Sequence, residues 1–376
     1  MNSPSNPAVN TDASVPVTTQ VWRNGRHMVR CVKAIQETWD VRTFCFMAEQ
    51  PVMFFFKPGQ FVTLELEIEG EQVFRSYTIS SSPSVPYSFS ITVKRAPGGL
   101  VSNWLHDNMV EGTELAVHGP VGQFNITDYP SDKVLMLSGG VGITPVMSMV
   151  RWLFDTNSAV DVEFIHSARS PKDIIYHREL EHIFSRIPEF KMHIVCEHSD
   201  DVGEAWYGFR GYLNRAMLDL MTPDFMEREI FCCGPTPYMN AVKHLLQQAG
   251  YDMNRYHEES FGATPVEDEE QAIQGAEQAA EDAEALLPSD MHEVTFAKTG
   301  KSVQIAPGET VHAAAAKVGL HIPKACGMGI CGTCKVMRLD GEVEMAHNGG
   351  ITDEDVAEGY ILTCCSVPQG NVVVDF

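Results

Sequence analysis

The sequence predicts a multi-domain protein with three successive folding units: an antiparallel β unit, a doubly wound α/β unit with a parallel sheet, and a small α+β unit. Short strand-like segments separated by Gly- and Pro-containing turns fill residues 27–128. Strands alternate with helices over 129–262, and short strands flank a Cys-rich loop within 291–376. A length of 376 residues suits about two or three domains.

Composition and charge exclude several classes of function. The chain has 27 Lys and Arg against 50 Asp and Glu, a formal net charge of −23. Phosphate backbones and anionic lipids repel such a chain, so we expect no nucleic-acid partner and no membrane partner. No signal segment stands at the N-terminus, and Gly and Pro interrupt the most apolar stretch, 134–150. The protein is therefore expected to be cytoplasmic.

The first unit reads as many short strands. Residues 1–26 are rich in Ser, Pro, Thr and Asn and are expected to form a disordered tail. The segment 27–128 is typical of a sandwich or a small barrel with one helix. Its strands are expected at 28–37, 42–49, 60–68, 76–81, 87–95 and 113–120, and its helix at 100–109.

The second unit, 129–262, alternates strands and helices, which favours a doubly wound parallel sheet. Strands are expected at 133–139, 161–169, 191–198 and 229–235, and helices at 144–156, 174–187, 214–221 and 237–250. The segment 263–290 holds nine acidic residues and no Lys or Arg, so we interpret it as a solvated linker. The third unit, 291–376, is expected to contain a hairpin at 292–310, a helix at 311–320 and closing strands at 360–364 and 371–376.

The Cys-rich loop CGMGICGTC carries metal-ligand spacing. Its C-x4-C-x2-C pattern, followed by a later Cys, is that of a plant-type [2Fe–2S] cluster. The expected ligands are Cys326, Cys331, Cys334 and Cys364. Gly327, Gly329 and Gly332 allow the turns that point backbone N–H groups at the sulfurs. A four-cysteine zinc site is the alternative, but such sites usually pair two C-x2-C arms and this loop has one. Cys365 is expected to face away as a small apolar residue.

The segment RSYTISSSP, 75–83, has side chains that suit a flavin nucleotide. Arg75 can pair with a phosphate, the Tyr77 ring can cover a flat heterocycle, and the Thr78 hydroxyl can donate near a ring nitrogen. Alone, the pattern also fits an ordinary strand. The later segment KRAPGGLVSNWL supports the flavin interpretation, because Gly98 and Gly99 precede a helix whose free N–H groups can bind an anion.

The segment SGGVGITP, 138–145, lies between a strand and a helix and suits a dinucleotide. Its glycines let a diphosphate approach the backbone, with Thr144 expected as N-cap and Pro145 as the first helical residue. It is not a full G-x-G-x-x-G, so a purely structural turn is the alternative. A second such loop, CCGPTPYM at 232–239, ends a later strand. His166, Ser167 and Arg169 follow a strand and could contact an adenosine ribose.

Together these motifs resemble the ferredoxin reductase superfamily with a fused plant-type ferredoxin. The resemblance covers about residues 27–376 and rests on RSYTISS, SGGVGITP, CCGPTPYM, and CGMGICGTC with YILTC. It implies an antiparallel Greek-key β-barrel for flavin, a doubly wound sheet for NAD and a β-grasp ferredoxin domain. The implied arrangement is that of reductase components of Rieske oxygenases and of the hybrid-cluster-protein reductase.

The resemblance also implies roles for individual residues. The Arg75–Thr78 segment, including Ser76, would bind the flavin, with Thr78 near its N5. Glu259 and Phe261 would be the acid and the aromatic beside the flavin ring, and the acid is one of four expected catalytic positions: Thr78, Thr144, Cys233 and Glu259. The flavin diphosphate would be lined by Lys94, Gly98, Gly99, Leu100, Val101 and Ser102. The nicotinamide nucleotide would be held by Gly140, Gly142, Thr144, Pro145, Ser167, Arg169, Cys233, Gly234 and Pro235.

The implied activity is electron transfer from NADH through FAD and a [2Fe–2S] cluster to a Rieske-type terminal oxygenase. FMN stays open as the flavin, although the turn at 98–102 before a helix suits a dinucleotide. NADPH stays open as the donor, because Arg169 alone does not decide between the two. Two other functions remain: a reductase for a different partner, such as a carnitine or stachydrine oxygenase or the hybrid-cluster protein, and a non-catalytic redox sensor.

Overall fold

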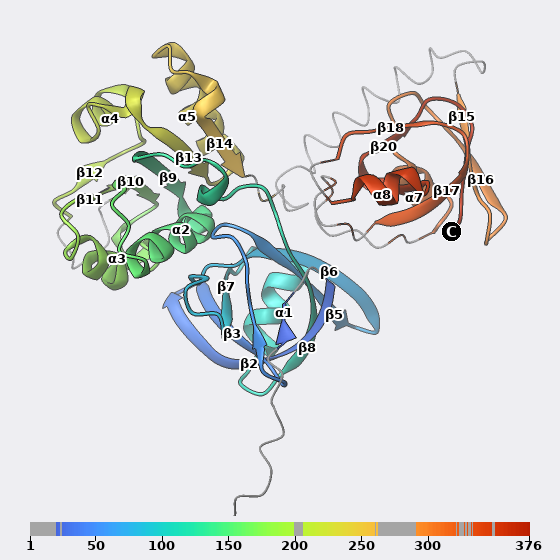
Figure 1. Ribbon diagram of the computed structural model, residues 1–376, viewed down its shortest axis with the longest axis horizontal. Coiled ribbons are helices and arrows are strands. Elements are labelled where there is room, and N and C mark those ends of the chain that lie inside the picture. Colours follow the sequence, from blue (N-terminus) through green and yellow to red (C-terminus); the bar gives the residue numbers. More distant parts are fainter. Residues whose placement is uncertain are drawn as a thin grey trace, which may run out of the picture.

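The computed structural model describes residues 20–22, 25–198, 206–259, 291–320, 334–347 and 350–376, with the single positions 261, 322, 327, 329 and 332. Figure 1 shows the three predicted folds in chain order: a curled antiparallel sheet in blue, a parallel sheet in green and yellow, and an α+β unit in orange and red. The predicted fold classes are confirmed. The expected linker at 263–290 lies outside the described residues.

The first sheet is antiparallel and closes on itself. Its six strands follow the order β6-β5-β8-β2-β3-β7, and a bridge between Ile79 and Ile91 joins its two edges into a barrel. Large apolar side chains such as Phe44 and Phe46 alternate inward along the strands and are fully buried. The strands are β2 (Gly25–Thr38), β3 (Val41–Ala48), β5 (Phe61–Ile68), β6 (Glu71–Thr78), β7 (Phe89–Lys94) and β8 (Glu114–Val121), and the helix is α1 (Leu100–Asn108).

The barrel begins earlier in the sequence than expected. Strand β1 (Gln20–Val21) pairs with β4 (Val52–Met53), and Trp22 is 2% exposed. The Trp22 ring stacks on Phe89 and meets Phe54 edge-on, so it is part of the barrel core. The tail predicted at 1–26 is therefore too long, because its C-terminal residues belong to the barrel. Residues 1–19 lie outside the described residues.

The second sheet is entirely parallel, with the order β12-β11-β10-β9-β13-β14. Its strands are β9 (Lys133–Gly139), β10 (Asp161–Ala168), β11 (Phe190–Cys196), β12 (Phe209–Arg210), β13 (Glu229–Cys233) and β14 (Tyr256–Glu259). Helices α2 (Ile143–Asp155) and α3 (His177–Phe184) cover one face, and α4 (Arg215–Met221) and α5 (Thr236–Gln248) cover the other. The strand order reverses between β9 and β13, where such sheets bind ligands.

The third unit is a mixed sheet with the order β16-β15-β21-β17-β19. Helix α7 (Val311–Lys317) packs Val311, Ala314 and Ala315 into the same core as the sheet. The sheet strands are β15 (His292–Phe296), β16 (Lys301–Ile305), β17 (Lys335–Asp340), β19 (Tyr360–Leu362) and β21 (Val372–Val374). A small ribbon of β18 (Val343–Met345) and β20 (Ser366–Pro368) and a short helix α8 (Asp353–Ala357) complete the unit. No helix in the described ranges is long and apolar enough to cross a bilayer.

Specific contacts join the barrel to helices α2 and α3. Arg151 of α2 donates to the Ser80 carbonyl at 2.6 Å while its guanidinium pairs with Glu179 of α3. Ser148 Oγ donates to the Ser81 carbonyl at 2.7 Å, and the Tyr176 hydroxyl bonds the Thr92 hydroxyl. These contacts hold β7 and the segment that follows β6 against the helices on one face of the parallel sheet.

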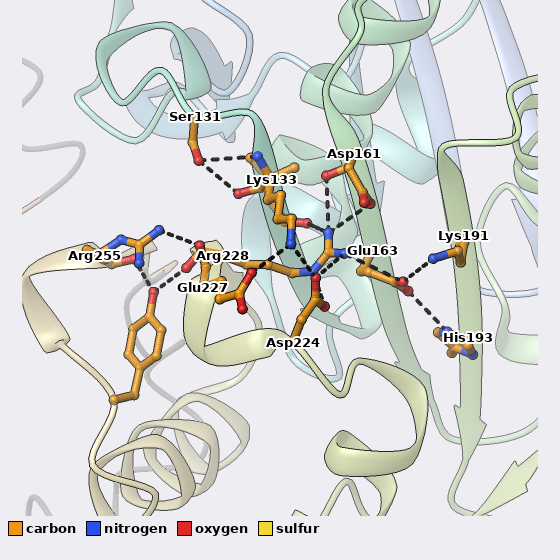
Figure 2. A network of polar contacts seen from close by, with 12 residues as sticks. Ser131, Lys133, Asp161, Glu163, Lys191, His193, Asp224, Glu227, Arg228 and Arg255 are labelled. Atoms are coloured by element: carbon orange, nitrogen blue, oxygen red, sulfur yellow. Dashed lines mark hydrogen bonds and ion pairs between the residues drawn. The ribbon is translucent and has the colours of Figure 1, made fainter.

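A buried ion network stabilises the opposite, amino edge of the parallel sheet (Figure 2). Arg228, whose side chain is 2% exposed, pairs with Asp161 at 2.9 Å and with Asp224 at 2.8 Å. The Arg228 guanidinium, with help from Lys133, holds the pKa of Asp224 at about 2. Glu163 extends the network to Lys191 and His193. The network joins the start of β10 to the segment that enters β13.

We expect Arg228→Ala to destabilise the parallel-sheet domain by about 3–5 kcal/mol, because it removes a fully buried side chain and takes from Asp161, Asp224 and the Val134 carbonyl the donor that they share. Urea unfolding followed by circular dichroism measures the loss. Arg215→Ala is the matched control, since the Arg215–Asp219 pair is half-exposed and should cost under about 1 kcal/mol. An Arg228 variant as stable as this control would contradict a stabilising role for the network.

Candidate functional site

The candidate site lies where the carboxyl edge of the parallel sheet meets β6 of the barrel. Thr78, the last residue of β6, is 5% exposed, and its Oγ1 lies 3.5 Å from Oε2 of Glu259, the last residue of β14. Burial raises the pKa of the Glu259 carboxyl to about 8, with a smaller opposing effect of the Thr78 hydroxyl. A neutral carboxyl can donate a hydrogen bond at this position, which a carboxylate cannot do.

The rest of the predicted flavin segment lies along β6. Arg75 is exposed, and Tyr77 is half-buried against the barrel core. Burial raises the pKa of the Tyr77 phenol, so the ring is neutral. The Ser76 hydroxyl bonds Thr63 Oγ1 at 2.9 Å, so this side chain is used within the barrel. The segment offers an exposed cation, an aromatic ring and a hydroxyl along one strand, which fits a flavin nucleotide.

The turn before α1 has the backbone of an anion site. Gly98 has φ of +69°, and Gly99 is the N-cap of α1 without a side-chain cap. A Cβ on Gly99 would lie 2.6 Å from Ser102 Oγ, which accepts from the Ala96 N–H at 3.2 Å. The first N–H groups of the helix therefore stay available for a ligand.

Side chains around this turn have different roles. Val101 is buried in the barrel core, and Leu100 is 52% exposed. Lys94 pairs with the buried carboxylate of Asp40 at 3.5 Å. Val101 can therefore offer a diphosphate its backbone but not its side chain. The Lys94 ammonium group would have to interact with both Asp40 and the diphosphate.

The two predicted nucleotide loops pack directly against each other. A Cβ on Gly142 would lie 2.3 Å from the Cys233 carbonyl oxygen, and a Cβ on Gly234 would lie 3.1 Å from the Gly139 nitrogen. Gly140 has φ of +53° with open space where a Cβ would be. Glycine is therefore required at Gly142 for packing, and at Gly140 it leaves room for a ligand to approach the backbone.

The start of α2 differs from the prediction. The helix begins at Ile143 with Gly142 as N-cap, because a 3-10 turn at Gly140–Gly142 runs directly into it. Thr144 is therefore not the N-cap, and Pro145 is not the first helical residue. The Thr144 hydroxyl donates to the Val141 carbonyl at 3.1 Å, and the side chain is 2% exposed. Thr144 thus stabilises the turn with its hydroxyl.

The Cys233 thiol is fully buried, which raises its pKa well above the ordinary value. It is a neutral thiol at the end of β13, and the exposed Pro235 starts the turn into α5. Phe261 is 43% exposed. A neutral, buried thiol can pack against an aromatic ligand but does not act as a nucleophile.

Buried polar atoms without partners lie at the carboxyl end of β10. His166 bonds Ser138 Oγ through Nδ1 at 2.7 Å, and burial lowers its pKa to about 3. Within the described residues, His166 Nε2, Ser167 Oγ and the Tyr238 hydroxyl are buried without a hydrogen bond of good geometry. Arg169 is exposed beside them. Such orphaned polar atoms fit a site that receives a polar ligand.

In the third unit, the structure places two of the four predicted cluster ligands together. Cys334 is 2% exposed, and both the N–H and the hydroxyl of Thr363 bond the Cys334 carbonyl at 3.1 Å. Cys364 therefore follows directly on a residue bound to Cys334. Cys326 and Cys331 lie outside the described residues. The four-cysteine ligand set stays a prediction.

Cys365 differs from the expectation that it faces away. Its Sγ lies 2.6 Å from where a Cβ on Gly329 would be, and it bonds the Leu362 carbonyl at 3.5 Å. Gly329 has φ of +67°, so the loop backbone approaches this sulfur closely. The thiol of Cys365 packs against the Cys-rich loop.

Sequence reasoning missed β14 and Tyr238. The strand is four residues long, YHEE, and has no apolar alternation to reveal it. Tyr238 stands inside the loop CCGPTPYM, but only the fold shows that its hydroxyl is buried beside Ser167 and Gly234. An aromatic residue three positions after the Gly234-Pro235 pair was the available signal.

Family comparisons match each of the three folding units. Residues 29–126 match the oxidoreductase FAD-binding domain, 136–244 the oxidoreductase NAD-binding domain, and 294–369 the 2Fe-2S iron-sulfur cluster binding domain. These ranges contain the flavin segment, both nucleotide loops and all four predicted ligand cysteines.

Among curated proteins, the chain is similar to reductase subunits. It is 74% identical to the glycine betaine monooxygenase reductase subunit of Pseudomonas aeruginosa, over 96% of this chain and 98% of that protein. The corresponding subunit of Chromohalobacter salexigens is 72% identical over the same shares. The stachydrine N-demethylase reductase subunit Stc4 of Rhizobium meliloti is 45% identical over 92% of this chain and 96% of that protein.

Solved structures show the same architecture. Phthalate dioxygenase reductase aligns with a TM-score of 0.57 over 94% of this chain and 98% of that chain, at 21% identity. That likeness concerns the fold alone. The FAD/NAD-binding domain of a Vibrio cholerae nitric oxide dioxygenase aligns with a TM-score of 0.57 at 26% identity, over 64% of this chain and all of that chain.

Proposed function

We propose a function from one premise: the chain belongs to the ferredoxin reductase family whose members join FAD-, NAD- and [2Fe–2S]-binding domains. The protein is an NADH-dependent reductase that passes electrons through FAD and a [2Fe–2S] cluster to an oxygenase. Its partner is a Rieske-type oxygenase that removes a methyl group from glycine betaine, giving dimethylglycine and formaldehyde. The reaction takes place in the cytoplasm.

One observation carries the reductase chemistry, the contact between Thr78 and Glu259. It brings the strand predicted for the flavin ring to the edge of the sheet predicted for the nicotinamide. The bound cofactors supply the redox chemistry, in which two electrons arrive together as hydride from NADH and leave singly through the cluster. The protein positions the two rings and excludes water from the space between them.

Different residues hold the flavin and the nicotinamide dinucleotide. Tyr77 offers an aromatic surface for the flavin ring, while the neutral Glu259 carboxyl and the Thr78 hydroxyl can hydrogen-bond its polar edge. The N-terminus of α1 binds the flavin diphosphate, and the glycine turn ahead of this helix favours FAD over FMN. Gly140 admits the nicotinamide dinucleotide to the backbone, and the buried Cys233 thiol packs beside the nicotinamide.

The partner is proposed from the near-full-length identity to the two betaine-type subunits. A reconstitution tests it: purified protein, a glycine betaine Rieske oxygenase, NADH, oxygen and glycine betaine, with formaldehyde as the product measured. We expect formaldehyde only when all five components are present. If NADH bleaches the flavin and cluster absorbance but no formaldehyde forms, the partner is wrong and the reductase chemistry stands. A stachydrine demethylase is the next oxygenase to test.

A further inference from the structure

Trp39 is a large aromatic side chain that the folded protein leaves in solvent. It lies in the turn between β2 and β3, and 68% of its surface is exposed. Its indole N–H donates to Asp173 Oδ1 at 2.8 Å, on the loop after β10, and Ser170 Oγ donates to the other oxygen of that carboxylate at 2.6 Å. Within the described ranges, no other ring and no cation stacks on Trp39, so a fixed aromatic surface faces solvent.

Backbone pairing places Trp39 directly beyond the end of β7. Val41, the first residue of β3, pairs with Lys94, the last residue of β7. The Arg95 N–H continues this register by donating to the Asp40 carbonyl at 2.7 Å. The Lys94 ammonium group also pairs with the buried Asp40 carboxylate at 3.5 Å. The turn that carries Trp39 is therefore fixed against the segment that leads from β7 into α1.

The expected path of the flavin nucleotide runs toward this turn. Its ring is expected at Thr78 and its phosphates at Arg75, so the nucleotide follows β6 backward. The bridge between Ile79 and Ile91 is antiparallel, so β7 runs forward in that same direction. Strand β7 ends just before the glycine turn of α1, where the diphosphate is expected. An adenosine attached to that diphosphate then continues beyond the end of β7, where Trp39 lies.

We propose that Trp39 is the stacking surface for the adenine ring of bound FAD. Adenine presents a flat π face, so an exposed indole can bind it by stacking without hydrogen bonds to its edge. FMN ends at its phosphate and has no group that reaches this surface. The bond to Asp173 fixes the indole before the nucleotide binds, which lowers the entropy lost on stacking. This role rests on the proposed function, because it requires a flavin nucleotide along β6.

The test measures flavin affinity in the full-length chain after its flavin has been removed. Wild type and Trp39→Ala are titrated with FAD and with FMN, and the quenching of flavin fluorescence gives the dissociation constants. We expect Trp39→Ala to weaken FAD binding by about ten- to a hundredfold, the usual cost of losing a base–aromatic stack. Its affinity for FMN should not change. An unchanged affinity for FAD, or an equal loss for both flavins, would overturn the proposal.

Two further variants separate stacking from other effects. Trp39→Phe keeps an aromatic face but loses the donor to Asp173, so it should retain more affinity for FAD than Trp39→Ala does. Tyr87→Ala removes another exposed aromatic side chain, ahead of β7 at the opposite end of that strand, and should leave both affinities unchanged. If Trp39→Phe loses as much FAD affinity as Trp39→Ala, the contact with Asp173 and not the aromatic face is responsible, and the proposal fails.

The adenine of NADH is the other adenine near this turn, because Asp173 lies on the loop after β10. In enzyme saturated with FAD, the KM for NADH in ferricyanide reduction should be the same in wild type and Trp39→Ala. A raised KM for NADH with unchanged affinity for FAD would assign the indole to NADH and overturn the proposal. A wild type that binds neither flavin contradicts the proposed function. A wild type that binds FAD with no dependence on Trp39 overturns only the role of Trp39.

Discussion

Replacing Cys364 by Ala is expected to remove the [2Fe–2S] cluster and to stop electron delivery to the oxygenase. NADH-dependent formaldehyde production should fall by more than about a hundredfold, because a cluster that lacks one of four thiolate ligands is not retained. Reduction of ferricyanide, which takes electrons from the flavin, should persist. Iron content and visible absorbance report the loss of the cluster independently of activity.

The adjacent residue, Cys365, provides a matched control for the Cys364 substitution. Cys364 follows Thr363, whose N–H and hydroxyl both bond the Cys334 carbonyl, so Cys364 stands beside a second predicted ligand. The Cys365 thiol instead bonds the Leu362 carbonyl and packs against Gly329. Cys365→Ala should therefore keep its iron and its coupling. The reverse result, with iron lost only in Cys365→Ala, would assign the fourth ligand to Cys365.

Local patterns predicted the regular elements well. Alternation along 42–49 predicted β3, because one face of that strand packs into the barrel core. The apolar run at 133–139 predicted β9, because both faces of that strand are buried. The motifs also predicted which strands end at the site. Three stretches, 24–46, 170–182 and 256–265, already resemble the reductase component of glycine betaine monooxygenase. Because this similarity can be seen in the sequence alone, it indicated the substrate class of the oxygenase partner before any geometry was known.

Features that depend on contacts between distant segments could not be predicted. Trp22 stands in a polar stretch typical of a tail, yet it is buried by Phe54 and Phe89. Thr144 has the residue type of an N-cap, but the preceding 3-10 turn moves the helix start to Ile143. In each case a tertiary contact or a neighbouring turn overrides a local preference.

The electrostatics of the site also depend on contacts between distant segments. HEESF was predicted to bring an acid to the flavin, but nothing in its letters shows that Glu259 would be partly buried. The pairing of β14 with β13 and the contact with Thr78 shield this carboxyl from water. The resulting rise in its pKa is a consequence of the fold and makes the stability of the protein depend on pH.

Glu259→Gln is expected to stabilise the protein at pH 8 and to flatten the pH dependence of its unfolding. The pKa of Glu259 is about 8 in the folded chain against an ordinary value of 4.5. Between these values the folded state binds a proton that the unfolded state has released, so stability falls as pH rises. At about 1.4 kcal/mol per pH unit, the loss amounts to roughly 4–5 kcal/mol by pH 8.

Urea unfolding at pH 5, 6.5 and 8 measures this slope in the wild type and in Glu259→Gln. The amide has no proton to lose, so the variant should lack the Glu259 contribution and should gain most over the wild type at pH 8. Glu189→Gln, an exposed carboxyl on the same domain, should follow the wild type throughout. Parallel slopes in the wild type and Glu259→Gln would mean that the carboxyl already ionises near its ordinary pKa. The site would then hold a charged acceptor beside Thr78, and the hydrogen-bond donor proposed for the flavin edge would have to be the Thr78 hydroxyl alone.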